Sequence, residues 1–168
     1  MNEFYDNVLR GNLTKELVKV LLEKAGYHVV PYGYESTLSD MKKRLGIKGT
    51  KKSKTVRKLR SSPDLLVYDE GIKDVMFVEV KMRNIQDETK LRMYEEKIAP
   101  YREFWDECIL VLVVPCGNLF YAQKVSELEK KKAYDMTEDF RKIEDIFTRV
   151  STQDVLHFRK IALQIMQK

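Results

Sequence analysis

The sequence contains few of the residues that cross-link small proteins. It has two cysteines, Cys108 and Cys116, and two histidines, His28 and His157, in 168 residues. Neither cysteine has a partner cysteine or a nearby histidine at the spacing of a metal site, and so few cysteines do not form a disulfide framework. We therefore interpret both cysteines as small buried hydrophobic residues and both histidines as structural residues.

Long apolar runs are also missing. The longest run, residues 109–114, is far shorter than the roughly 20 residues that cross a bilayer. The sequence shows no charged-then-apolar leader, so we expect a soluble, cytoplasmic protein without a membrane partner. Its length fits one domain with a core of its own, and no repeat or low-complexity linker divides it.

Hydrophobic spacing predicts a helix and then a β-hairpin in the first half of the chain. An apolar stripe at helical spacing marks the helix, Asn12 can cap its start, and Gly26 can end it. Residues 27–30 predict a short strand, and residues 65–82 predict a hairpin with its turn at residues 69–71. The stripe consists of Leu13, Leu17, Val20 and Leu21.

The second half of the chain continues the alternation. Apolar residues between 91 and 105 predict a long helix that Pro100 must kink or split. The apolar run 109–114 predicts a strand covered on both faces, and residues 119–125 predict another strand. The order helix, three strands, helix, two strands predicts an α/β fold in which helices flank a mixed sheet.

The C-terminal residues, about 137–167, are predicted to be helical. Apolar residues between 140 and 150 form one stripe, and Ser151 with Asp154 has the pattern of a capping box at the start of a final helix. These helices either cover a sheet face or form a dimer contact, and the spacing does not decide between the two.

The strand at residues 75–82 carries the candidate chemistry. Because successive side chains alternate between faces, Glu79 and Lys81 share one face, roughly 6–7 Å apart, and the apolar residues of the other face should be the more deeply buried. Asp64 stands at the start of the partner strand, after Pro63, which restricts the backbone. Two carboxylates that converge here form the hard-oxygen site that Mg²⁺ prefers.

Such a site is suited to phosphodiester hydrolysis. A bound metal would contact the scissile phosphate and lower the pKa of a bound water, while the Lys81 ammonium would position that water or neutralise developing negative charge. The alternative is that Glu79 and Lys81 form an ordinary ion pair on a solvated strand face, which contributes little.

Acidic residues are absent from residues 41–63, which carry ten basic residues. Since the whole chain has a net charge of +5 and this segment alone contributes +10, the rest of the chain has a net charge of −5. Such a run is either a solvated loop or a polyanion-binding segment, and its position immediately before Asp64 favours binding to a phosphate backbone. Gly46 and Gly49 are too close together for a P-loop, so no nucleotide cofactor is expected. The basic residues are Lys42, Lys43, Arg44, Lys48, Lys51, Lys52, Lys54, Arg57, Lys58 and Arg60.

The stretch S-S-P-D-L-L-V-Y-D followed by V-M-F-V-E-V-K resembles the signature of the PD-(D/E)XK nucleases. The signature aspartate, acid and lysine fall at Asp64, Glu79 and Lys81, and the resemblance covers about residues 12 to 125. It implies a restriction-endonuclease-like core of αβββαββ order, and the length of the chain leads us to expect a single nuclease domain over residues 1–168. It also implies cleavage of DNA with Mg²⁺, for which Mn²⁺ can substitute.

The resemblance implies roles for further residues. Many members carry an acid on the first helix, for which Glu16 is the candidate. RecB-like members carry Q-x-x-x-Y on the helix after the lysine, and here Lys97 replaces the glutamine while Tyr101 matches. Two cysteines are too few for the iron–sulfur cluster of some RecB-like members. The implied catalytic residues are Asp64, Glu79, Lys81, Glu16 and Tyr101; the implied metal ligands are Asp64, Glu79, the Val80 carbonyl and the candidate Glu16; Arg83 and Lys97 join the basic segment in binding DNA.

Two functional hypotheses follow. The first is a Mg²⁺-dependent deoxyribonuclease that acts on double-stranded or branched DNA. It is either an exonuclease of the RecB branch or an endonuclease resembling archaeal Holliday junction resolvases, and a homodimer would favour the endonuclease. The second is a non-catalytic nucleic-acid-binding module that keeps the fold and uses the basic segment alone.

Overall fold

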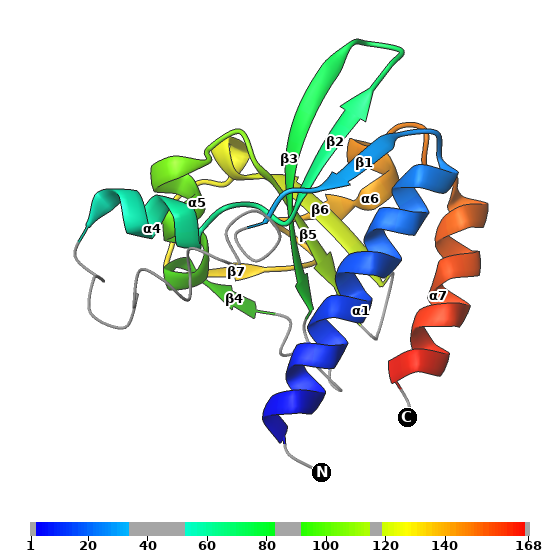
Figure 1. Ribbon diagram of the computed structural model, residues 1–168, viewed down its shortest axis with the longest axis horizontal. Coiled ribbons are helices and arrows are strands. Elements are labelled where there is room, and N and C mark those ends of the chain that lie inside the picture. Colours follow the sequence, from blue (N-terminus) through cyan, green and yellow to red (C-terminus); the bar gives the residue numbers. More distant parts are fainter. Residues whose placement is uncertain (1–2, 34–52, 83–91, 115–118, 167–168) are drawn as a thin grey trace.

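The centre of the fold is a six-stranded mixed β-sheet (Figure 1). The computed structural model describes residues 3–33, 53–82, 92–114 and 119–166. Neighbouring strands pair antiparallel except β3 and β5, which are parallel. In spatial order the strands are β1 (His28–Pro31), β2 (Leu65–Asp69), β3 (Asp74–Met82), β5 (Ile109–Val113), β6 (Phe120–Lys124) and β8 (Arg141–Lys142). The predicted hairpin and mixed α/β sheet are confirmed.

Helices cover both faces of this sheet. Figure 1 shows α1 and α7 side by side on one side of the molecule and α4 and α5 together on the other. The helices are α1 (Glu3–Lys24), α4 (Lys54–Arg60), α5 (Glu95–Phe104), α6 (Ile143–Ile146) and α7 (Thr152–Met166), with a 3₁₀ turn, η2 (Val125–Glu127). None of the described helices is long and apolar enough to cross a membrane.

Strand β5 divides the interior into two apolar clusters. Its side chains alternate, so Ile109, Val111 and Val113 pack with α1 and α7, whereas Leu110 and Leu112 pack with α5. All five residues of β5 are buried, as predicted for a strand covered on both faces. The parallel neighbour β3 is therefore held in place from both sides.

Helix α1 differs from its prediction in length and in its buried face. It begins at Glu3, so Asn12 lies inside it rather than capping it, because apolar spacing marks only the part of a helix that packs. Gly26 does end it, with a positive φ of 88°. The predicted stripe is wrong at two positions, since Leu13 and Val20 are exposed. The buried residues of α1 are Thr14, Leu17, Val18, Leu21 and Leu22.

The helix predicted for residues 91–105 is shorter at its start. Arg92–Tyr94 forms strand β4, which pairs antiparallel with β7 (Ala133–Asp135) in a separate two-stranded sheet. Helix α5 then runs on through Pro100, so the proline does not split it. A strand of three residues has too little alternation to be distinguished from the first turn of a helix.

The C-terminal region is only partly helical. Residues 141–142 form β8 and pair with β6, and α6 is a single turn, so the helix predicted from about residue 137 is wrong there. The apolar residues between 140 and 150 are buried, but a loop can also bury residues at this spacing, so the spacing did not identify a helix. The capping box is confirmed, since Ser151 Oγ accepts a hydrogen bond from the Asp154 N–H at 3.1 Å and Asp154 Oδ2 accepts one from the Ser151 N–H at 3.3 Å.

Candidate active site

Two acids and a lysine from the β2–β3 hairpin meet at one point. Leu65 of β2 pairs with Val78 of β3, so one step further along the hairpin Asp64 stands opposite Glu79. Oδ2 of Asp64 accepts a hydrogen bond from the Val80 N–H at 3.0 Å, which fixes the carboxylate against β3. The structure therefore brings Asp64, Glu79 and Lys81 together.

Glu79 is as deeply buried as the apolar residues around it. Its exposed fraction of 5% equals that of Val80 on the opposite face. The side chain of Lys81 is 30% exposed, whereas Val78 and Val80 are both buried, so the apolar face is still the more buried one, as expected. Helix α5 and the residue after it cover the Glu79 face, where Tyr101 approaches Lys81 and Trp105 packs on Phe77 at 5.2 Å between ring centroids. Glu79 and Lys81 consequently do not form an ion pair on a solvated surface.

Lys81 links the buried acid to Tyr101. Its ammonium donates hydrogen bonds to Oε1 of Glu79 and, at 3.1 Å, to the Tyr101 hydroxyl. It also lies 5.1 Å from the centroid of the Tyr101 ring. Burial and the negative charge of Glu79 raise the pKa of Tyr101 above its ordinary value, so its hydroxyl stays protonated.

The environment of Glu79 disfavours its charged form. Burial raises its pKa from 4.5 to about 7, with a further rise from the charge of Asp64, while the Lys81 ammonium opposes the shift. Oε2 of Glu79 is buried and has no hydrogen-bond partner among the described residues. An uncompensated acceptor beside a second carboxylate is the kind of atom that a cation would satisfy.

Lys15 is a residue of the site that the sequence did not reveal. Its Nζ lies 2.7 Å from Oδ1 of Asp64, so both oxygens of this carboxylate are engaged. The reason is the orientation of α1. Each helical residue advances about 100° around the axis, and burial of Thr14 and Val18 turns Lys15 toward the sheet edge. Its spacing of three from Val18 was the available signal.

The same orientation places Glu16 away from the two acids. Glu16 lines the cleft, but its side chain is 61% exposed and its Oε1 lies 3.1 Å from Nζ of Lys19. The described part of the chain contains no group of three or more histidine, cysteine, aspartate or glutamate residues close enough to hold a metal. Glu16 is thus not gathered with Asp64 and Glu79 as the sequence suggested.

The candidate cleft lies between α1, the start of β2, β3 and α5. Its volume is about 460 Å³, and Asp64, Glu79, Lys81 and Tyr101 all line it. Asp64 and Glu79 supply the one or two carboxylates that Mg²⁺ takes when waters and phosphate oxygens complete its octahedron, so the donor chemistry fits this ion. Val80 contributes its N–H to Asp64, and its carbonyl as a ligand stays a prediction.

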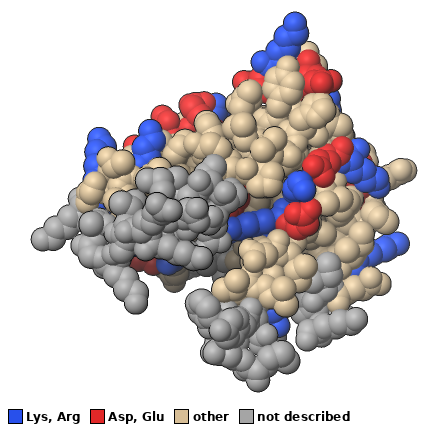
Figure 2. Space-filling view, in the orientation of Figure 1, with Lys and Arg blue, Asp and Glu red and all other residues tan. Residues whose placement is uncertain are grey.

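The predicted DNA-binding residues fall into two groups. Lys54, Arg57, Lys58 and Arg60 belong to α4, and Arg60 lines the cleft. Figure 2 shows blue side chains over α4 at one edge and alternating blue and red side chains along α1. Lys97 lies exposed on α5. The remainder lie outside the described residues: Lys42, Lys43, Arg44, Lys48, Lys51, Lys52 and Arg83.

Comparison with known proteins gives a similarity to solved structures. No family model matches the sequence, and no curated protein matches it. The structure is similar to that of Archaeoglobus fulgidus Hjc, a Holliday junction resolvase from an archaeal hyperthermophile. The identity is 18%, the alignment covers 82% of this chain and 98% of that chain, and the TM-score is 0.47.

The raised pKa of Glu79 predicts a specific dependence of stability on pH. Because the folded-state pKa of about 7 exceeds the unfolded value of 4.5, the folded protein binds this proton more tightly. The stabilisation that this proton gives the folded state is fully present below pH 4.5. It is lost as the pH rises through about 7, which lowers the free energy of unfolding by about 3 kcal/mol.

Glu79→Gln should remove this fall in stability with rising pH, because the amide does not titrate. The free energy of unfolding of the metal-free proteins is measured with denaturant at pH 5 and pH 8. The wild type and the exposed control Glu70→Gln should lose about 3 kcal/mol more than Glu79→Gln. Equal losses in all three proteins would show that Glu79 titrates normally.

Proposed function

We propose that this chain is a divalent-metal-dependent nuclease of the PD-(D/E)XK type that hydrolyses DNA phosphodiester bonds. The observation that carries the proposal is the meeting of Asp64 with a buried Glu79 whose Oε2 has no partner among the described residues. An acid buried in this way costs stability, and a bound cation recovers that cost. Lys81 stands beside the acid pair, where a phosphate would enter the cleft.

Each side chain then has a separate task. Asp64 and Glu79, with the Val80 carbonyl, would hold Mg²⁺ or Mn²⁺. When bound, the ion polarises the scissile phosphate and lowers the pKa of a coordinated water. Lys81 keeps its ammonium next to Glu79, where it orients the attacking water and neutralises charge on the transition state. Tyr101 fixes the ammonium by accepting its hydrogen bond.

The cations around the cleft support a polyanionic substrate. Arg60 lines the cleft at the end of α4, and this helix belongs to the basic segment of residues 41–63. Backbone neutralisation of this kind does not depend on base sequence. We therefore propose double-stranded or branched DNA as the substrate.

One observation favours the second candidate, a non-catalytic binding module. Lys15 and the Val80 N–H engage both oxygens of Asp64, and Lys81 engages one oxygen of Glu79, so the acids are partly neutralised by the chain itself. A module of this kind would bind DNA through its cations and leave the phosphodiester intact. The experiment below separates the two candidates.

Glu79→Gln should abolish DNA cleavage, because the amide supplies one neutral ligand oxygen in place of a carboxylate. Labelled linear, circular and branched DNA are incubated with the wild type in Mg²⁺ or Mn²⁺. We expect cleavage that falls at least about 100-fold in Glu79→Gln and persists in Glu70→Gln, an exposed control. Tight binding without cleavage in either metal would support the binding module instead.

Tyr101→Phe should lower the cleavage rate without removing it. The phenylalanine keeps the ring beside Lys81 and loses only the hydroxyl that accepts its hydrogen bond. A lost hydrogen bond to a charged group corresponds to a decrease of about 10- to 100-fold in the rate at saturating DNA and metal. Tyr94→Phe, an exposed position, is the control. An unchanged rate in Tyr101→Phe would make Tyr101 a packing residue only.

Lys15→Met should increase the stabilisation that a metal provides. In the metal-free protein the substitution removes the cation from Oδ1 of Asp64, with an expected loss of about 1 kcal/mol. Bound Mg²⁺ or Mn²⁺ then no longer competes with the ammonium, so the rise in Tm on adding metal should exceed that of the wild type. Lys19→Met, which affects a lysine paired with Glu16, is the matched control. A smaller rise in Lys15→Met than in the control would contradict this role.

A further inference from the structure

A second hollow opens beside the candidate active site, between α4 and α5. Its volume is about 460 Å³, and it is called here the α4–α5 groove. It shares Arg60, Lys81 and Tyr101 with the candidate cleft, so the two hollows meet at these side chains. A strand whose phosphate reaches Lys81 would therefore continue into this groove.

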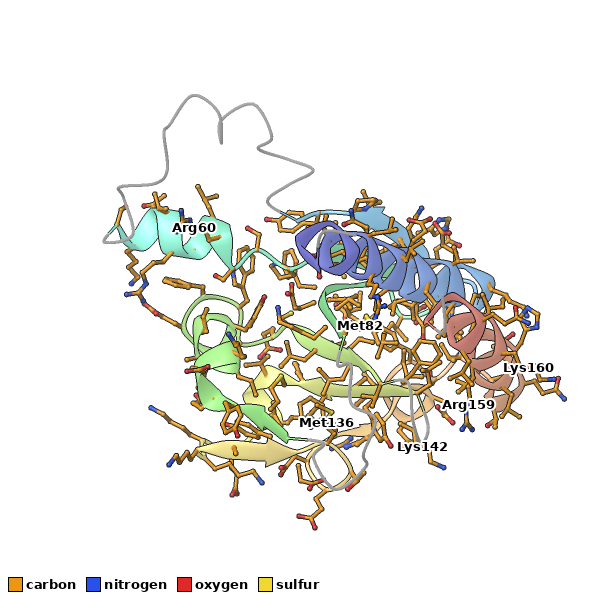
Figure 3. All side chains as sticks on the ribbon, turned by 90° about the horizontal axis from the view of Figure 1, so that it is seen from below. Arg60, Met82, Met136, Lys142, Arg159 and Lys160 are labelled. Atoms are coloured by element: carbon orange, nitrogen blue, oxygen red, sulfur yellow. The ribbon has the colours of Figure 1, made fainter. Side chains whose placement is uncertain are left out.

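Four contacts hold the walls of the groove together. Arg57 of α4 forms an ion pair with Glu103 of α5, and its guanidinium lies 5.4 Å from the ring centroid of Phe104. Lys58 lies 5.1 Å from the ring centroid of Trp105, whose indole N–H donates to the Lys58 carbonyl at 3.4 Å. Figure 3 shows α4, with Arg60 labelled, on the same side of the molecule as α5. The groove is thus a built feature of the fold.

The groove combines positive charge with an apolar surface. Arg57, Arg60 and Lys97 contribute cations in addition to Lys81, while Glu96 and Glu103 are its acids. Lys97 lies 3.9 Å from Glu96, a long contact, and its side chain is 58% exposed. The apolar surface comes from Ala99, Pro100 and Phe104. Cations beside an apolar wall match the phosphate of a nucleotide and the flat face of its base.

We propose that the α4–α5 groove binds the nucleotide next to the scissile phosphate, and binds it unpaired. A base inside a duplex is stacked on its neighbours, so it cannot lie on an apolar protein wall until it leaves the stack. The groove volume falls within the range of about 300–1,000 Å³ that is usual for small-molecule sites. The inference rests on the proposed nuclease function and narrows the substrate to DNA with unpaired nucleotides at the cleavage point, as in frayed ends and branches.

The test compares two labelled DNA duplexes by fluorescence anisotropy without divalent metal, so that nothing is cleaved. One duplex is blunt and fully paired, and the other carries three mismatched base pairs at each end. Lys97→Glu and Ala99→Glu place an acid in the groove. Lys160→Glu makes the same charge change as Lys97→Glu on α7, which lies on the opposite side of the molecule (Figure 3).

The wild type and Lys160→Glu should bind the mismatched duplex more tightly than the blunt one. In Lys97→Glu and Ala99→Glu the affinity for the mismatched duplex should fall about fivefold or more, and the preference should disappear. A wild type without preference would overturn the proposal, as would groove variants that bind both duplexes like Lys160→Glu. Variants with an altered Tm are replaced by Lys97→Ala, which adds no charge and should still weaken the preference.

Cleavage of the same duplexes in Mg²⁺ and Mn²⁺ distinguishes this inference from the proposed function. If the groove variants cleave these duplexes as efficiently as the wild type, the proposed binding site in the α4–α5 groove is wrong, while the proposed nuclease function is supported. A groove-dependent preference in binding, with no cleavage in either metal, overturns the nuclease and leaves the groove as a site for unpaired DNA.

Discussion

The hydrogen bond from the Val80 N–H to Oδ2 of Asp64 is the contact on which the site depends. It joins the residue before β2 to the middle of β3 and so holds one carboxylate beside another that is buried. Burying like charges together is unfavourable, and the chain offsets this by placing Lys81 on Glu79 and Lys15 on Asp64. The result is a preformed acidic pair whose charge the chain itself neutralises only in part.

The sheet makes this arrangement possible. Strand β3 pairs antiparallel with β2 and parallel with β5, and residues 78–80 are buried on both faces. Such a strand has little freedom to move, because its interior neighbours are closely packed. Burial also disfavours the charged form of the Glu79 carboxyl, which is why its pKa is raised above the ordinary value although the Lys81 ammonium opposes the shift. The same burial therefore holds β3 in place and raises the pKa of Glu79.

Local patterns predicted much of this fold. Alternation identified the β2–β3 hairpin and put Glu79 and Lys81 on one face, and the Ser151–Asp154 spacing identified the start of α7. Contacts between distant segments were not predictable. The burial of Glu79 depends on α5, and the choice of Lys15 over Glu16 depends on how α1 is turned against the sheet. The pairing of β6 with β8 likewise joins residues about twenty positions apart, and no local sequence pattern indicates this pairing.

Asp154 does more than cap its own helix. Its second oxygen lies 3.0 Å from Nζ of Lys24, at the end of α1, so one carboxylate joins the end of the first helix to the start of the last one. Val155 and Phe158 extend this attachment through the same apolar cluster as Leu17 and Leu21. The rotation of α1, and with it the position of Lys15, is consequently secured from its far end by the final helix. Helix α7, which begins more than 70 residues after Lys81 in the sequence, thus helps to hold the α1 side of the candidate cleft in place.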